Sequence, residues 1–323
     1  MLVPILLFLL GFVMLIKGGD WFVDGAVGIA HRFHLPELLI GATVVSIGTT
    51  LPEVMVSAQA AMQGNSGISY GNAIGSIICN TSLIAALTMA IKPGKVNTKT
   101  FMLPSIFFGV AAVLYSLIAY TSGTFARWQG IGFLVFFVIY MVTSVLHMKK
   151  NPEAAEDTEE DDEEKERPLW MELVLLVIGA AVIAVGANLL VNNGTKIAQA
   201  LGVPDSVIGL TMVALGTSLP ELVTAITSLV KGHGALSLGN IIGANLFNIV
   251  LVSGMAISIR PFALPAEKML AGHNASLLVD MPVMWLVMLI MCVPSLVKGE
   301  IKRWQGIALL LIYVAFTAFQ FIG

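Results

Sequence analysis

The sequence predicts an all-α polytopic membrane protein with ten transmembrane helices, arranged as two five-helix repeats of inverted topology. Three observations carry this prediction. The chain of 323 residues is 57% hydrophobic and only 11% charged, with a mean hydropathy of +0.90, whereas soluble domains carry roughly 25% charged residues. Several apolar runs reach the ~20 residues that cross a bilayer. Two motifs also occur twice at one constant spacing, which is typical of an internal duplication.

The apolar runs define the expected spans. Their approximate limits are 2–28, 36–62, 69–91, 101–121, 126–148, 169–192, 204–230, 236–259, 275–297 and 303–322. Five spans per half is an odd number, so the second half enters the membrane upside down relative to the first. The expected units are a first five-helix repeat at 1–148, an acidic cytoplasmic linker at 149–168 and a second five-helix repeat at 169–323.

The linker and the loops set the expected orientation. Residues 153–166 hold half of the twenty acidic residues, and such a like-charge block stays solvated. With the N-terminus outside, twelve Lys and Arg residues fall in inner loops and four in outer loops. Positive charge marks the cytoplasmic side, so we expect a multi-pass membrane protein with both termini outside. The opening run lacks a basic start and a cleavage site, which favours a first helix over a signal peptide.

The repeated motifs lie 168 positions apart. Gly48-Thr49-Thr50-Leu51-Pro52-Glu53 returns as Gly216-Thr217-Ser218-Leu219-Pro220-Glu221. Gly71-Asn72-Ala73-Ile74-Gly75-Ser76, followed by Asn80, returns as Gly239-Asn240-Ile241-Ile242-Gly243-Ala244, followed by Asn248. Each copy places one glutamate inside an apolar span, where an ionisable group is expensive and is by default a functional candidate.

The chemistry of these motifs favours a hard cation. Pro52 and Pro220 cannot donate a backbone hydrogen bond, so we expect each motif to interrupt its helix and to present carbonyl oxygens. The hydroxyls of Thr49, Thr50, Thr217 and Ser218 and the carboxylates of Glu53 and Glu221 add further oxygen ligands. Oxygen ligands suit sodium and calcium and offer nothing soft enough to favour a transition metal.

The second motif supplies two further candidate ligands of the site. Asn80 and Asn248 are expected ligands, and the glycines spaced by four are expected to let another helix approach closely. We expect Asn72 and Asn240 to bond to freed backbone rather than to an ion.

Glu53, Glu221, Asn80 and Asn248 together carry about two negative charges. One calcium ion neutralises this charge, as do two sodium ions or two protons, and mutually exclusive filling of one site is what an exchanger needs. The neutral hydroxyls beside each glutamate favour sodium over the proton as the counter-ion. A cation channel is the alternative from another class, but two converging carboxylates predict tight occlusion rather than leaky binding.

The paired motifs resemble the two alpha repeats of the calcium/cation antiporter superfamily, and most closely those of prokaryotic sodium/calcium exchangers. The resemblance implies that the two glutamates bind calcium with help from the backbone oxygens of Thr49 and Thr217. It implies sodium sites built from Ser76, Asn80, Asn248 and the carbonyl of Ala214. It also implies alternating access, with the first and sixth helices sliding against the rest.

Three positions depart from that resemblance. Ala244 stands where the first repeat has Ser76, Ile77 stands where the second repeat has Asn245, and Asn248 replaces an aspartate of some prokaryotic relatives. These departures concern the sodium sites and leave the calcium-binding pair intact. We expect no enzyme activity, because the glutamates have no catalytic partner, and no resident cofactor. The expected partners are calcium and sodium ions and the lipid bilayer, with no nucleic acid and no protein partner implied.

Two smaller patterns complete the picture. Arg127-Trp128-Gln129-Gly130-Ile131 returns as Arg303-Trp304-Gln305-Gly306-Ile307, which marks the fifth and tenth spans as counterparts. We interpret both as interfacial anchors. Asp20, in the first span, is expected to pair with Lys17.

Overall fold

The computed structural model describes residues 2–150, 167–201, 214–265, 269–270 and 272–322. In the first half the elements are α1 (Leu2–Arg32), α2 (Glu37–Ile40), η1 (Gly41–Val45), α3 (Ser46–Gln63), α4 (Ser66–Cys79), η2 (Asn80–Ala85), α5 (Ala86–Ile91), β1 (Gly94–Lys95), α6 (Thr98–Thr121), β2 (Thr124–Phe125) and α7 (Arg127–Lys150). In the second half they are α8 (Leu169–Ala200), α10 (Ala214–Thr217), α11 (Leu219–Val230), α12 (Gly234–Phe247), η5 (Asn248–Ser253), α13 (Gly254–Ile259), β3 (Phe262–Ala263), β4 (Met269–Leu270), β5 (His273–Asn274), η6 (Ser276–Asp280), α14 (Met281–Lys298), β6 (Glu300–Ile301) and α15 (Arg303–Ile322). The η elements are π-helical turns that continue directly into neighbouring α-helices.

The structure confirms an all-helical membrane protein. Eight segments of the described chain are long and apolar enough to cross a membrane, and they correspond to the expected spans one to six, eight and nine. The expected seventh span falls partly on residues 202–213, outside the described residues, and its described part contains α10 and α11. The expected tenth span is α15, a helix of 20 residues. The linker residues 151–166 also lie outside the described residues.

The segments differ strongly in how much of their surface other helices cover. In Gly234–Ile259, Ser66–Ile91 and Glu37–Gln63, 83%, 67% and 56% of the most apolar window is buried, against 22% in Leu2–Arg32 and in Leu169–Ile197. The motif-bearing helices therefore form the centre of the bundle, while α1 and α8 expose apolar side chains such as Leu9 and Val177. An exposed apolar surface is the form that a lipid-facing helix requires.

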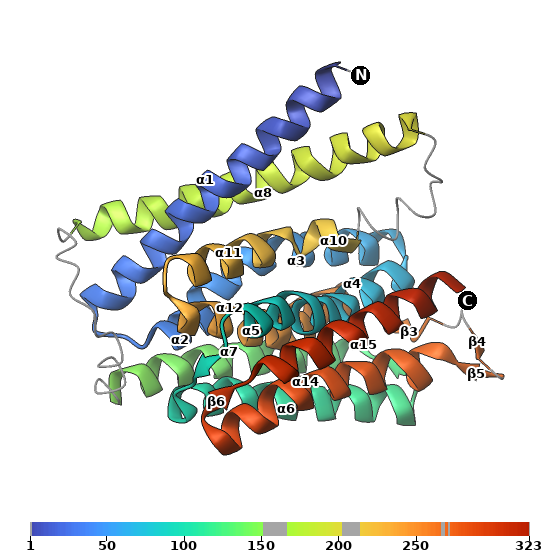
Figure 1. Ribbon diagram of the computed structural model, residues 1–323. Helices are drawn as coiled ribbons and strands as arrows, with labels where there is room; N and C mark the ends of the chain where they lie inside the picture. Colours follow the sequence, from blue (N-terminus) through green and yellow to red (C-terminus); the bar gives the residue numbers. More distant parts are fainter. Residues whose placement is uncertain (1, 151–166, 202–213, 266–268, 271, 323) are drawn as a thin grey trace.

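α1 and α8 cross each other above the bundle and run in opposite directions (Figure 1). The crossing is close because glycines lie at the contact. A Cβ atom at Gly186 would lie 2.9 Å from the Gly11 carbonyl oxygen, and one at Gly25 would lie 2.6 Å from the Glu172 carbonyl oxygen. Real Cβ atoms do not approach backbone so closely, so glycine at these positions permits the close contact between the two helices.

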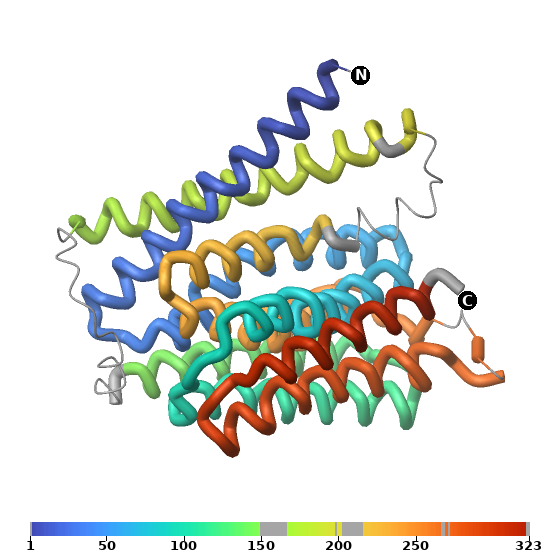
Figure 2. The backbone as a smooth tube through the Cα atoms, viewed as in Figure 1, coloured from blue at the N-terminus to red at the C-terminus, as the bar shows by residue number. Residues whose placement is uncertain are grey.

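The loops at the two ends of the bundle join one half of the chain to the other. β1 pairs antiparallel with β6 at one end, and β2 pairs antiparallel with β3 at the other. α1 begins and α15 ends at the same end of the bundle (Figure 2). Each of these two strand pairs takes one strand from each half of the sequence, whereas β4 and β5 pair within the second half.

The repeated Arg-Trp-Gln-Gly-Ile motif does more than anchor the chain at the interface. Trp128 and Trp304 are exposed, as an anchor requires. Each motif glutamine caps the start of its own helix: Gln129 accepts a hydrogen bond from the Ala126 N–H at 2.7 Å, and Gln305 accepts one from the Lys302 N–H at 2.7 Å. Side-chain caps of this kind satisfy amide groups that the first helical turn leaves unpaired.

The motif glycines connect the two halves. α7 packs on α13, and α15 packs on α5. A Cβ at Gly130 would lie 2.9 Å from the Gly254 carbonyl oxygen, and a Cβ at Gly306 would lie 2.6 Å from the Ala90 amide nitrogen. The last helix of each half therefore rests on a helix of the opposite half.

We expect Gly306→Val to lower the thermal unfolding midpoint of the detergent-solubilised protein. The added side chain would push α15 away from α5, and overpacking of this kind costs about 1–3 kcal/mol. Gly132→Val is the matched control, because a Cβ at Gly132 meets no described atom within 4 Å. Equal midpoints for the two variants would contradict the close contact.

Candidate cation-binding site

The two repeated glutamates approach each other inside the bundle. Glu53 lies within α3 and Glu221 lies in the first turn of α11, and both side chains are completely buried. α3 and α11 contact each other, so the two buried acids lie on adjacent helices. The expected convergence of the two acids is therefore present, and their role as ligands stays a prediction.

The two repeated asparagines occupy matching positions in the structure. Asn80 begins the π-helical turn η2 and Asn248 begins the π-helical turn η5, and both side chains are completely buried. α11, which carries Glu221, contacts η2, and α3, which carries Glu53, contacts η5. Each asparagine turn thus packs on the glutamate helix of the opposite half. π-Helical turns are rare and frequently occur at functional sites.

Polar atoms without partners gather at this place. Among the described residues, the buried side-chain atoms that have no hydrogen-bond partner include both carboxylate oxygens of Glu53 and Glu221, both amide atoms of Asn80 and Asn248, and the hydroxyls of Thr50 and Ser218. Buried polar groups are normally paired, since an unpaired group costs free energy. Carboxylate, amide and hydroxyl oxygens are ligands of calcium. The donor set therefore fits a hard cation.

The helix interruption is present in only one of the two motifs. In the second copy α10 ends at Thr217, Ser218 has non-helical dihedral angles (φ −89°, ψ 6°) and α11 begins at Leu219. In the first copy α3 continues through Pro52, so the expected break there is wrong. The Gly48 carbonyl still receives no bond from Pro52, because proline has no N–H. The irregular turn of this span lies earlier, at η1.

The remaining predicted residues lie along the same helices. Ser76 is buried on α4, one turn before Asn80 and therefore on the same helix face. Thr217 is half-buried at the end of α10, and Ala214 is the first residue of that helix. α10 contacts α4, which brings the Ala214 segment against the helix of Ser76.

Asn72 and Asn240 support the motif helices. The Asn72 amide donates hydrogen bonds to the Glu53 carbonyl at 3.0 Å and to the Ser57 hydroxyl at 2.8 Å. This agrees with the predicted backbone-bonding role. The Asn240 amide oxygen instead accepts a hydrogen bond from Thr49 at 3.1 Å. Asn240 therefore holds a side chain of the opposite half, which the prediction did not include.

Sequence reasoning missed Ser46 and Ser57. The Ser46 hydroxyl donates to the Asn240 carbonyl at 2.9 Å, and Ser57 holds Asn72. The repeat could not reveal them, because the positions that correspond to these serines in the second half are Ala214 and Ala225. The one feature of the sequence that could have identified these serines is a hydroxyl that occurs in the first copy of the repeat and not in the second.

The glycine pairs have different surroundings in the two halves. Cβ atoms at Gly239 and Gly243 would meet the backbone of Leu38 and Ala42, so the expected close approach is present there. Cβ atoms at Gly71 and Gly75 would meet no described atom within 4 Å. The segment that corresponds to Leu38 and Ala42 in the second half lies at 206–210, outside the described residues, so the prediction for this pair stays untested.

Known proteins share this sequence and architecture along the whole chain. The sequence profile of the sodium/calcium exchanger protein family matches residues 3–146 and 171–322. An uncharacterised membrane protein of Methanocaldococcus jannaschii is 38% identical over 95% of this chain and 94% of its own length. The sodium/calcium exchanger MaX1 of Methanosarcina acetivorans is 32% identical over 99% of each chain.

A solved structure agrees with the sequence comparisons. The sodium–calcium exchanger NCX_Mj, in crystals soaked with sodium and strontium ions, superposes with a TM-score of 0.81 at 34% identity, and the match covers 98% of each chain. The profile match alone spans well over half of the sequence. The chain therefore belongs to the sodium/calcium exchanger protein family.

Proposed function

We propose that this chain is a secondary active antiporter that exchanges calcium for sodium across the membrane by alternating access. The observation that carries the proposal is the pair of fully buried carboxylates, Glu53 and Glu221, whose four oxygens have no hydrogen-bond partner among the described residues. A carboxylate in an apolar interior needs a compensating positive charge. A transported cation supplies that charge, and it can be replaced by another cation of the same total charge.

Calcium and sodium fit the charge of the site. The two carboxylates balance one calcium ion or two sodium ions, and the surrounding amides and hydroxyls add neutral oxygen ligands. We assign calcium to Glu53 and Glu221 with the backbone oxygens of Thr49 and Thr217. We assign sodium to Ser76, Asn80, Asn248 and the carbonyl of Ala214, with the hydroxyls of Thr50 and Ser218 completing the set. MaX1 and NCX_Mj are sodium/calcium exchangers, which favours sodium over the proton and an exchanger over a channel.

The chain is proposed to contain ten spans in two inverted repeats, 1–148 and 169–323, with the linker 149–168 between them. The eight apolar segments support eight of these spans, and α11 and α15 belong to the other two. The opposite directions of α1 and α8 support the inversion. The interhalf strand pairs β1–β6 and β2–β3 lie at opposite ends of the bundle, as counterparts in inverted halves would. The loop charges support an orientation with both termini outside, and the prokaryotic relatives support a location in a prokaryotic plasma (inner) membrane.

The differences between the halves support alternating access. The two copies of the motif are nearly identical in sequence, but the first copy is a continuous helix around Pro52 and the second is interrupted at Ser218. Asn240 bonds to Thr49 of the opposite half, whereas Asn72 bonds within its own half. In a transporter built from inverted repeats, the two halves have different local conformations in any one state. When the access side changes, each half takes the conformation that the other half had.

We expect Glu53→Gln and Glu221→Gln each to reduce sodium-dependent calcium uptake to the background level. The amide keeps the size of the side chain but removes the charge that holds calcium. The assay is calcium flux into proteoliposomes with sodium, potassium and proton gradients imposed one at a time. Glu300→Gln is the control, because Glu300 is a loop residue paired with Lys302 at 2.8 Å. Uptake retained in both motif variants, or uptake that ignores the sodium gradient, would refute the proposal.

Asn248→Asp is expected to raise the number of sodium ions needed to displace calcium. A third carboxylate increases the negative charge of the site, so the Hill coefficient of sodium inhibition should rise from about two towards three. Asn80→Asp adds the same charge at the corresponding position of the other half and should act in the same direction. Unchanged coefficients in both variants would show that these positions lie outside the ion site.

A further inference from the structure

A buried polar contact joins the two halves of the chain beside Asn80. The Asn245 amide on α12 donates a hydrogen bond to the Thr81 hydroxyl at 2.7 Å, and Thr81 is the second residue of η2. The Met288 sulfur on α14 accepts from the Thr81 hydroxyl at 3.2 Å and from the Asn245 amide at 3.3 Å. Asn245 and Thr81 are completely buried. The contact therefore connects α12, η2 and α14 without access to water.

This contact has no polar counterpart in the other copy of the repeat. The positions that correspond to Asn245 and Thr81 are Ile77 and Ile249, and both of these are also completely buried. The Asn245 amide oxygen has no hydrogen-bond partner among the described residues, and an unpaired buried polar atom costs free energy. Folding stability alone would thus favour isoleucine at position 245, so the asparagine requires another reason.

The two asparagine turns are held in different ways. In η5 the Ser253 hydroxyl donates to the Asn248 carbonyl at 3.0 Å, so this turn is closed by a bond of its own. The corresponding residue of η2 is Ala85, which has no hydroxyl. η2 instead receives a hydrogen bond from the opposite half, through Asn245. The position of η2 therefore depends on α12.

Asn245 lies close in sequence to one candidate sodium ligand and bonds next to the other. Asn248 follows Asn245 by three residues, which is one turn along the same side of the helix. Thr81 directly follows Asn80. The side chains of Asn80 and Asn248 have no hydrogen-bond partner among the described residues, so the turns that carry them determine where their oxygens lie. A bond that fixes η2 against α12 therefore fixes the two amides relative to each other.

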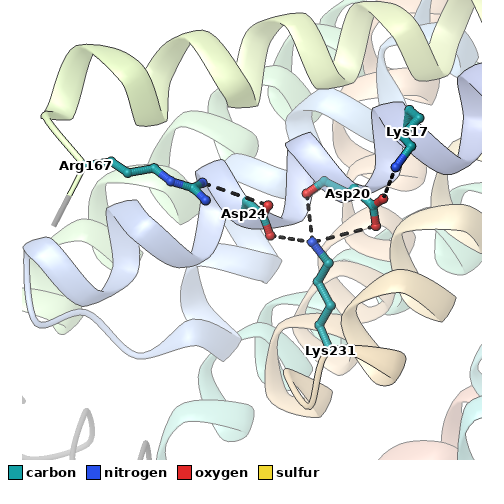
Figure 3. A network of polar contacts seen from close by, with 5 residues as sticks. All are labelled: Lys17, Asp20, Asp24, Arg167 and Lys231. Carbon is teal, nitrogen blue, oxygen red and sulfur yellow. Dashed lines mark hydrogen bonds and ion pairs between the residues drawn. The ribbon is translucent and has the colours of Figure 1, made fainter. Parts of the chain in front are cut away.

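The charged network at one end of the bundle is a link of another kind (Figure 3). Its members are Lys17, Asp20, Asp24, Arg167 and Lys231. Lys17 lies 3.8 Å from Asp20, so the expected pair is one part of this larger network. The five side chains are 28–64% exposed, and partly exposed ion pairs are weak. A hydrogen bond in a dry interior is stronger than one in water, so the Asn245 bond is the link suited to hold a ligand in place.

We propose that Asn245 is a positioning residue for the sodium site, which sets the place of the Asn80 side chain by bonding to Thr81. The role rests on the proposed function, in which Asn80 and Asn248 bind sodium and the two glutamates bind calcium. Loss of the bond therefore weakens the effect of sodium and leaves the response to calcium unchanged. A contact with a purely structural role would change the response to both ions.

The first test removes the bond and keeps the shape of the contact. Thr81→Val has nearly the same volume as the parent residue and lacks the hydroxyl. Calcium uptake is measured in sodium-loaded proteoliposomes with increasing external sodium. We expect the sodium concentration for half-inhibition to rise about threefold to fivefold, the effect of one neutral hydrogen bond. The calcium concentration for half-maximal uptake, without external sodium, should stay unchanged.

Three further variants separate positioning from stability. Thr81→Ser retains the hydroxyl and should retain the sodium sensitivity of the parent. Thr88→Val is the matched control, because the Thr88 hydroxyl donates to the nearby Ala85 carbonyl at 2.8 Å and makes no contact between the halves. Thr81→Val combined with Asn245→Leu replaces both partners by apolar groups, which is nearly neutral for stability. This double variant should have the thermal unfolding midpoint of the parent and the sodium shift of Thr81→Val alone, since both changes remove the same bond.

Two results would overturn the positioning role. One is an equal response to sodium in Thr81→Val and Thr88→Val, whether shifted or not. The other is a double variant that recovers the sodium sensitivity of the parent together with its stability, as a structural contact would. The parent protein by itself tests the antiport. Uptake that ignores sodium in the parent refutes the proposed function and the positioning role together, whereas sodium-driven uptake with unshifted variants refutes the positioning role alone.

Discussion

The structure is organised around two carboxylates that are completely buried in an apolar bundle. Glu53 and Glu221 come from different halves of the chain, and each costs free energy where it lies. The surrounding elements serve to hold this unfavourable pair in position. Asn240 fixes Thr49, Asn72 fixes the Glu53 carbonyl, and the asparagine turns η2 and η5 pack on the opposite glutamate helices. In the proposed function, a cation compensates this unfavourable pair, so cation binding and helix arrangement are linked.

The sequence was sufficient for the general architecture because the constraints on it are simple. A bilayer demands long apolar helices, and the duplication pairs each residue of one motif with a counterpart 168 positions away. The convergence of Glu53 with Glu221 followed from that pairing. So did the equivalence of Asn80 and Asn248, because symmetry-related helices must place equivalent residues at equivalent depths. The charged loop residues added the expected orientation.

The same symmetry caused the errors. It predicted a broken helix in both motifs, whereas α3 continues through Pro52 and only the second motif is interrupted. It concealed Ser46 and Ser57, which have no hydroxyl counterpart. It also gave Asn72 and Asn240 one role, although they bond to different partners. Sequence symmetry describes what two halves share over all their states, while a structure shows one state in which they differ. Contacts made by only one of the two halves, such as the bond from Thr49 to Asn240, therefore had no signal in the sequence.

The interhalf contacts of Gly130 and Gly306 have a consequence for biosynthesis. α7, which carries Gly130, is translated long before its packing partner near Gly254. α5, which carries Ala90, is translated even longer before its partner Gly306. Until then, narrow glycine surfaces shaped for protein neighbours face lipid or the insertion machinery. Folding must therefore finish after translation, when α15 packs against α5, which was inserted into the membrane much earlier. Truncated chains that lack α15 should be substrates for membrane quality control rather than functional half-transporters.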